Sequence, residues 1–165
     1  MTNKNAGITG SLIYIHGSLG RALDHVRPLL LLGTRLFVSW QFLKGGWLKL
    51  SNWEVTLELF RSEYHVPLLP PDLAAVAGTF GELFFPILLV TGLFSRIGAL
   101  GLFAVNAMAV VSYWHVLGSE GYEAALAQHL LWGYMLTVIA FFGGGLLSLD
   151  SLLEKRLPRQ RATGA

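Results

Sequence analysis

Several ionisable side chains lie within otherwise apolar stretches of this 165-residue chain, among them Arg35, Lys44, Glu82, His115 and His129. An ionisable group in hydrocarbon is costly, so it normally faces the interior of a helix bundle or a cavity. Histidine, lysine and glutamate can donate hydrogen bonds and can accept or release protons. Such a set suits the polar head of a ligand that is bound inside a membrane.

The segments that carry these residues are long and apolar. The chain is 53 % hydrophobic and only 13 % charged, whereas soluble domains carry about 25 % charged residues. A membrane-spanning helix needs about 20 largely apolar residues, and four segments meet this requirement: Pro28–Leu50, Leu73–Phe94, Ile97–Leu117 and Leu126–Leu147. We therefore predict an all-α fold, a four-helix transmembrane bundle, in contact with a lipid bilayer.

The first outer loop, Ser51–Pro71, has the pattern of a short amphipathic helix. Trp53, Leu57, Phe60 and Tyr64 recur at helical spacing, with charged residues between them. Such a helix lies on the membrane surface or over the mouth of the bundle.

Three regions follow from this pattern. Residues 1–27 form an N-terminal cytoplasmic or interfacial segment, in which Gly10–Val26 is expected to be a surface helix. Residues 28–153 form the membrane domain, and Pro28 is expected to open its first helix, because proline is tolerated in a first helical turn. Residues 154–165 form a basic cytoplasmic tail.

The positive charges predict the orientation. Loops rich in lysine and arginine stay in the cytoplasm. Eight of the twelve Lys and Arg residues fall on one side of the predicted bundle: Lys4, Arg21, Arg27, Arg96, Lys155, Arg156, Arg159 and Arg161. Both termini are therefore predicted to be cytoplasmic.

Depth in the membrane suggests which polar residues meet. At about 1.5 Å per residue, Arg35 lies roughly 10 Å from the cytoplasmic end, Glu82 roughly 18 Å and Lys44 roughly 24 Å. We expect an Arg35–Glu82 ion pair, either structural or functional, while Lys44 can reach toward the outer surface. His115 and His129 both come out at roughly 27 Å.

These positions predict one ligand site near the outer surface. Its members would be Lys44, Trp47, Glu82, His115, His129 and Trp132, with the tryptophans as walls and Glu82 as a deeper proton acceptor. The alternative for the histidines is that they bond only to backbone or water. A second alternative is a haem held by the two histidines at their matched depth.

Several other functions are excluded or weakly supported. The chain has no cysteine, which excludes disulfides, thiolate nucleophiles and cysteine-ligated metal centres. A net charge of +2 gives no nucleic-acid signal, and the glycines do not have phosphate-loop spacing. The glycines instead favour close helix approach, and we expect no metal site.

The ordered set of motifs resembles the DoxX family of small four-helix membrane proteins. The matching features are Arg35, the run Phe42–Leu50 with Asn52-Trp53, Gly81-Glu82-Leu83, Gly92–Arg96 and Leu147–Asp150. The resemblance covers residues 28–153. It implies a bacterial-type inner-membrane protein linked to quinone-dependent redox chemistry. A DoxD-type relative is a subunit of thiosulfate:quinone oxidoreductase and works with a second subunit.

Two functional hypotheses remain open. In the first, the protein is a quinone-linked subunit of a membrane oxidoreductase complex, with quinone as its ligand and a protein partner. In the second, it is a non-catalytic membrane anchor or scaffold for a partner. Solute transport is less favoured, because four helices leave little room for a midplane site unless the protein forms an oligomer.

Overall fold

Seven helices make up the regular structure of residues 4–156, the part of the chain that this computed structural model describes; side chains are described from residue 14 onward. The helices are α1 Lys4–Ser51, α2 Trp53–Ser62, α3 Pro71–Thr91, α4 Ser95–Ser112, α5 Trp114–Leu117, α6 Glu123–Phe142 and α7 Leu149–Arg156. The predicted all-α class is confirmed. Most of the predicted basic tail, residues 157–165, lies outside the described residues.

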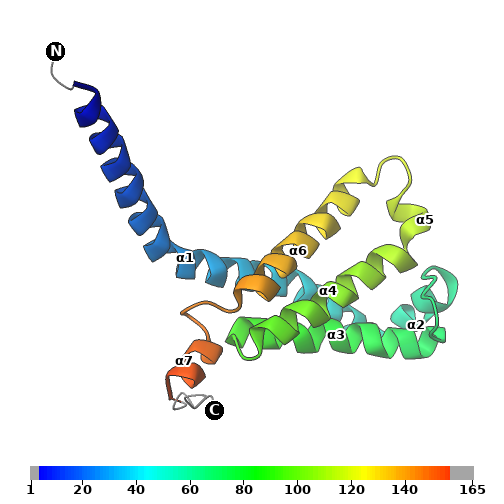
Figure 1. Cartoon of the computed structure of the whole chain (residues 1–165). Coiled ribbons are helices and arrows are strands. Elements are labelled where there is room, and N and C mark those ends of the chain that lie inside the picture. The colour runs from blue at the N-terminus through cyan, green and yellow to red at the C-terminus, as the bar shows by residue number, and fades with distance from the viewer. Residues whose placement is uncertain (1–3, 157–165) are drawn as a thin grey trace, which may run out of the picture.

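Within residues 4–156, three helices are long and apolar enough to cross a membrane: α3, α4 and α6. The predicted first span, Pro28–Leu50, lies within α1, which packs along α3 (Figure 1). The charged residues Arg35, Lys44 and Lys49 lower its apolar character, so a fourth span remains a prediction. The predicted third span is divided, because the chain turns at Tyr113 between α4 and α5.

Helix α1 is continuous through Pro28, contrary to the prediction that this proline opens a helix. Figure 1 shows α1 bending between its blue N-terminal part, which points away from the bundle, and the paler part that runs along α3. A proline inside a helix removes one backbone hydrogen bond and clashes with the preceding turn, which bends the helix.

The apolar core lies between α1, α3, α4 and α6 and is built from aliphatic and aromatic side chains: Val38, Phe42, Leu89, Ala99, Leu102, Leu136 and Ile139. Glycines bring the helices close together. A Cβ on Gly81 would lie 2.6 Å from Val105 Cγ2, and one on Gly101 would lie 2.3 Å from Phe85 Cε1. The expected role of these two glycines in close packing is confirmed.

The predicted amphipathic helix is α2. Its apolar face packs on the start of α3, where Phe60 contacts Ala74 and Ala75 in a second buried cluster. Two polar contacts fix its position. Thr56 Oγ1 donates to the carbonyl of Lys49 at the end of α1 (2.9 Å), and Arg61 on α2 pairs with Asp72 on α3.

Candidate functional site

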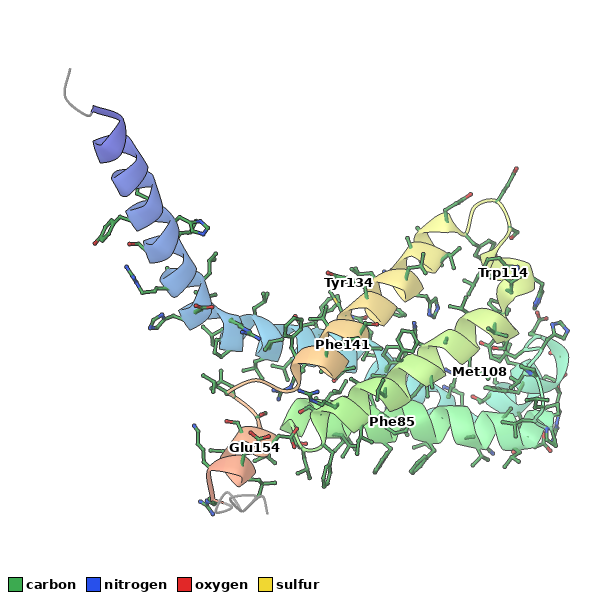
Figure 2. The ribbon with its side chains drawn as sticks, in the orientation of Figure 1. Phe85, Met108, Trp114, Tyr134, Phe141 and Glu154 are labelled. Atoms are coloured by element: carbon green, nitrogen blue, oxygen red, sulfur yellow. The ribbon has the colours of Figure 1, made fainter. Side chains whose placement is uncertain are left out.

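A cavity of about 450 Å³ lies between α3 and α4, and α2 and the connection after it close one end. Ligand pockets in proteins measure roughly 300–1,000 Å³. Most of the cavity wall is apolar. Figure 2 shows two of the wall residues, Phe85 on α3 and Met108 on α4, on the helices that form its sides.

One wall of the cavity carries an ion pair. Lys49 Nζ donates to both Glu82 carboxylate oxygens at 2.6 Å. The Lys49 side chain is 24 % exposed and that of Glu82 is 12 % exposed. Glycine lets α1 and α3 approach here, since a Cβ on Gly46 would lie 2.9 Å from Leu83 Cγ and 3.0 Å from Glu82 Cβ. The pair therefore presents a matched positive and negative charge to a largely apolar space.

Two tyrosines line the end of the cavity nearest α2. Tyr64 follows α2 and Tyr113 follows α4, and their rings meet edge to face with centroids 5.2 Å apart. Burial raises the pKa of Tyr64 above its ordinary value, and the nearby Tyr113 and Glu82 add to this shift. Tyr64 is therefore protonated at neutral pH and can donate a hydrogen bond.

His129 reaches the cavity from α6, held by Asn106 on α4. His129 Nδ1 donates to Asn106 Oδ1 (2.9 Å), and Asn106 Nδ2 donates to the His129 carbonyl (3.0 Å). This reciprocal pair fixes the ring orientation. In the neutral ring it leaves Nε2 as a hydrogen-bond acceptor.

The structure does not gather the six predicted site residues. Glu82 and His129 line the cavity. Trp132 does not line the cavity but contacts His129, and the centroids of their two rings are 5.0 Å apart. Lys44 and Trp47 are exposed side chains of α1 and do not line the cavity.

His115 is likewise exposed, in α5, where it contacts His65. No signal in the sequence reveals this neighbour, because His65 lies in the connection between α2 and α3, 50 residues before His115.

Lys49, Tyr64 and Tyr113 were not among the predicted site residues. A signal for Lys49 does exist in the sequence. It lies four residues after Gly45, hence on the same helix face as the glycine against which α3 packs. Lys44 is adjacent to Gly45 and projects about 100° away from that face.

The expected Arg35–Glu82 ion pair is wrong. Arg35 is only 1 % exposed, but its guanidinium donates to backbone carbonyls at the end of α3 and in the loop after α6: Leu89, Val90, Gly144 and Leu147. The last carbonyls of a helix have no intrahelical partner and carry partial negative charge, so they attract a cation. Glu82 lies level with Gly45, ten residues beyond Arg35, which is roughly 15 Å along α1.

The family model of DoxX matches residues 30–115. This chain belongs to the DoxX family. The matched range holds every residue that lines the cavity except Leu117 and His129. The cavity of this DoxX protein is thus built almost entirely from the family region.

One curated relative of this DoxX protein is an uncharacterized protein of Haemophilus influenzae. The two are 29 % identical over 133 residues, which cover 78 % of this chain and 85 % of the relative. No solved structure matches the chain. Family membership and the three apolar helices make it a membrane protein.

Three of the family-like motifs, Arg35, Gly92–Arg96 and Leu147–Asp150, are far apart in the sequence of this DoxX protein. They meet at the end of the bundle opposite α2. The Asp150 carboxylate accepts the backbone N–H groups of Phe94 (2.7 Å) and Ser95 (2.8 Å) at the start of α4. The Asp150 N–H in turn donates to the Gly92 carbonyl (2.9 Å). Asp150 thus joins the α3–α4 hairpin to the first turn of α7, and Arg35 joins α3 to the loop after α6; both roles are structural.

Proposed function

We propose that this DoxX protein is the quinone-binding subunit of a membrane oxidoreductase and that the quinone head group occupies the cavity between α3 and α4. The single observation that carries this proposal is the combination of an apolar wall with the Lys49–Glu82 pair in one half-open cavity. A quinone has two apolar ring faces and two carbonyl oxygens that accept hydrogen bonds, so it requires both features.

Each polar group has a role in this proposal. The Lys49 ammonium and the Tyr64 hydroxyl donate to the quinone carbonyl oxygens. Glu82 accepts a proton when the bound species is a quinol, and Phe85 and Met108 flank the ring. All of these residues line the same cavity.

The isoprenoid tail leaves the cavity between α3 and α4. The lining residues Ala77, Ala104 and Met108 are exposed, so the cavity is open along this part of α3 and α4, where the tail would pass into the lipid. Electrons pass between the quinone and a redox centre on a separate partner subunit, as the resemblance to the DoxD-type subunit implies. The site then lies near the outer face of the inner membrane, with both termini in the cytoplasm.

A non-catalytic anchor or scaffold is the second candidate. The observation that favours it is the broad exposure of Trp40 (60 %) and Trp47 (67 %) on the outer face of α1. Exposed aromatic side chains of this size suit contact with a partner protein as well as with lipid.

Equilibrium binding of a short-chain ubiquinone or menaquinone analogue to the protein in lipid nanodiscs distinguishes the two candidates. We expect saturable binding by calorimetry. A hydrogen bond inside a membrane contributes about 1–2 kcal/mol, so Lys49→Met should weaken binding roughly 5–30-fold. The matched control is Lys44→Met, which removes an exposed lysine from the same helix and should not change the affinity.

A pair of size variants on α4 tests whether the quinone occupies this cavity. Ala109 lines the cavity, whereas Ala107 faces outward on the same helix. Ala109→Phe should abolish binding and Ala107→Phe should not. Absence of saturable binding by the wild-type protein, or equal binding by Ala109→Phe and wild type, contradicts the proposal and favours the anchor.

A further inference from the structure

We propose that His65 and His115 form a two-histidine site for a transition-metal ion at the end of the cavity nearest α2. His65 lies in the connection between α2 and α3, and His115 lies in α5. Their Nδ1 atoms are 3.4 Å apart, their ring centroids are 4.7 Å apart, and both side chains are exposed. The site departs from the expectation of no metal, because folding brings together two histidines that are 50 residues apart.

The separation of the two nitrogens suits a shared metal ion better than a direct hydrogen bond. Hydrogen bonds donated by N–H groups are usually about 2.7–3.2 Å long, which is shorter than the observed distance. Two Zn–N bonds of about 2.0–2.1 Å at a tetrahedral angle place the nitrogens about 3.4 Å apart. The spacing of the two Nδ1 atoms therefore fits one shared ion, which a small rotation of the rings would bring both nitrogens to bind.

Contacts that do not involve the His65 ring hold the two segments together. The His65 backbone N–H donates to the Ser112 carbonyl at the end of α4 (2.9 Å). The Tyr113 ring packs edge to face against the rings of both Tyr64 and His115. The ring centroids are 5.2 Å apart for Tyr64 and 5.3 Å apart for His115. The histidines are thus brought together before any ion binds, which reduces the ordering cost of binding.

The ligand chemistry selects the class of ion. Neutral imidazole suits Zn²⁺, Ni²⁺ and Cu²⁺, whereas Mg²⁺ and Ca²⁺ prefer oxygen ligands. Two protein ligands leave the remaining coordination positions to water, as the exposure of both rings allows. Tyr64, Val66, Ser112 and Tyr113 line the cavity, so a bound ion would tie the connection after α2 to α5 across this end of the cavity.

The test is calorimetric titration of the full chain with Zn²⁺ alone. The protein is purified in mild detergent through a tag without histidine and is first treated with a chelator. We expect one site per chain. Loss of an outer-shell partner already lowers metal affinity roughly 10–100-fold, so His65→Gln and His115→Gln should each lower it at least tenfold, and the double variant should not bind. The control is His16→Gln/His25→Gln, which removes two exposed histidines from the N-terminal part of α1 and should bind like wild type.

Electron paramagnetic resonance of the wild-type protein with one equivalent of Cu²⁺ gives a second readout that does not depend on any variant. The expected spectrum carries the superhyperfine pattern of two imidazole nitrogens. The proposal is overturned if the wild-type protein binds no Zn²⁺, if the His65→Gln/His115→Gln variant binds as tightly as wild type, or if the Cu²⁺ spectrum shows no nitrogen ligands. The quinone proposal is independent of all three results.

Discussion

Glu82 on α3 accepts two 2.6 Å hydrogen bonds from the ammonium group of Lys49 on α1. The pair spans the interface between the two helices at the level of Gly45 and Gly46, where the absence of side chains lets the backbones approach. A carboxylate in this setting needs a positive partner, because an unpaired charge away from water is strongly destabilising. The pair therefore stabilises the contact between α1 and α3 and places both charges on the cavity wall.

The first prediction concerns the stability of this pair. Breaking a buried pair by removing one partner costs about 3–5 kcal/mol. We expect a value near the lower end of that range for Lys49→Met and for Glu82→Gln, because Lys49 keeps some exposure. Thermal unfolding in detergent, monitored by size-exclusion chromatography, should show a lower midpoint for each variant.

The double variant and a control complete this experiment. Lys49→Met/Glu82→Gln should lose less stability than the sum of the two single losses, because neither charge is left unpaired. Lys44→Met, on the exposed face of α1, should unfold like wild type. Strictly additive losses would count against a direct interaction between Lys49 and Glu82.

The second prediction concerns Arg35. Arg35→Met leaves four backbone carbonyls without their donor, and hydrogen bonds to charged groups contribute roughly 1.5–3 kcal/mol each. We expect a loss of at least about 3 kcal/mol in the free energy of unfolding. Arg35→Lys should not restore stability, because an ammonium cannot match the fork of donors in a guanidinium.

Arg27 provides the matched control for Arg35. Its guanidinium lies 5.3 Å from the centre of the Phe142 ring, a contact that contributes about 0.5–1 kcal/mol at an exposed site. Arg27→Met should therefore have a small effect in the same unfolding assay. Wild-type stability of Arg35→Lys would show that the backbone contacts of the guanidinium contribute little.

The third prediction concerns the packing of α3 on α4. A Cβ on Gly101 would lie 2.3–2.5 Å from three atoms of the Phe85 ring, so Gly101→Ala must displace a side chain that lines the cavity. We expect a loss of about 1–3 kcal/mol from overpacking. Gly101→Ala/Phe85→Leu should recover part of it, as measured by the unfolding midpoint.

A glycine in open space is the comparison. A Cβ on Gly33 in α1 would meet nothing within 4 Å. Gly33→Ala should therefore be neutral, or stabilising by up to about 1 kcal/mol through helix propensity. Equal effects of the two glycine substitutions would mean that Gly101 is not needed for the approach of α4 to α3.

The fourth prediction is that α1 spans the membrane. In that case a tag at the N-terminus and a reporter inserted at residue 60 lie on opposite sides, with the N-terminus and the C-terminus both cytoplasmic. Accessibility of each tag to an impermeant reagent in spheroplasts measures this. If the N-terminal tag and residue 60 lie on the same side, only α3, α4 and α6 cross the membrane.

Hydropathy and periodicity in the sequence determined where most helices of this protein lie, although not the continuity of α1 through Pro28 or the turn at Tyr113. Long apolar runs predicted the helices of the bundle, the Trp53–Tyr64 pattern predicted α2, and the glycines predicted close packing at Gly81 and Gly101. These are local properties, because residues three or four apart on a helix share a face whatever the rest of the chain does.

Only the tertiary structure decided which charges meet. Arg35, Lys44 and Lys49 all lie on α1, and the choice of Lys49 as the partner of Glu82 depends on the rotation of α1 and on its register against α3. A rotation of about 100° separates adjacent helical positions, so depth alone cannot select the partner. The cavity and the contact between His65 and His115 arise in the same way, since they join segments that the sequence separates and that only the packing of α2, α4 and α5 brings together.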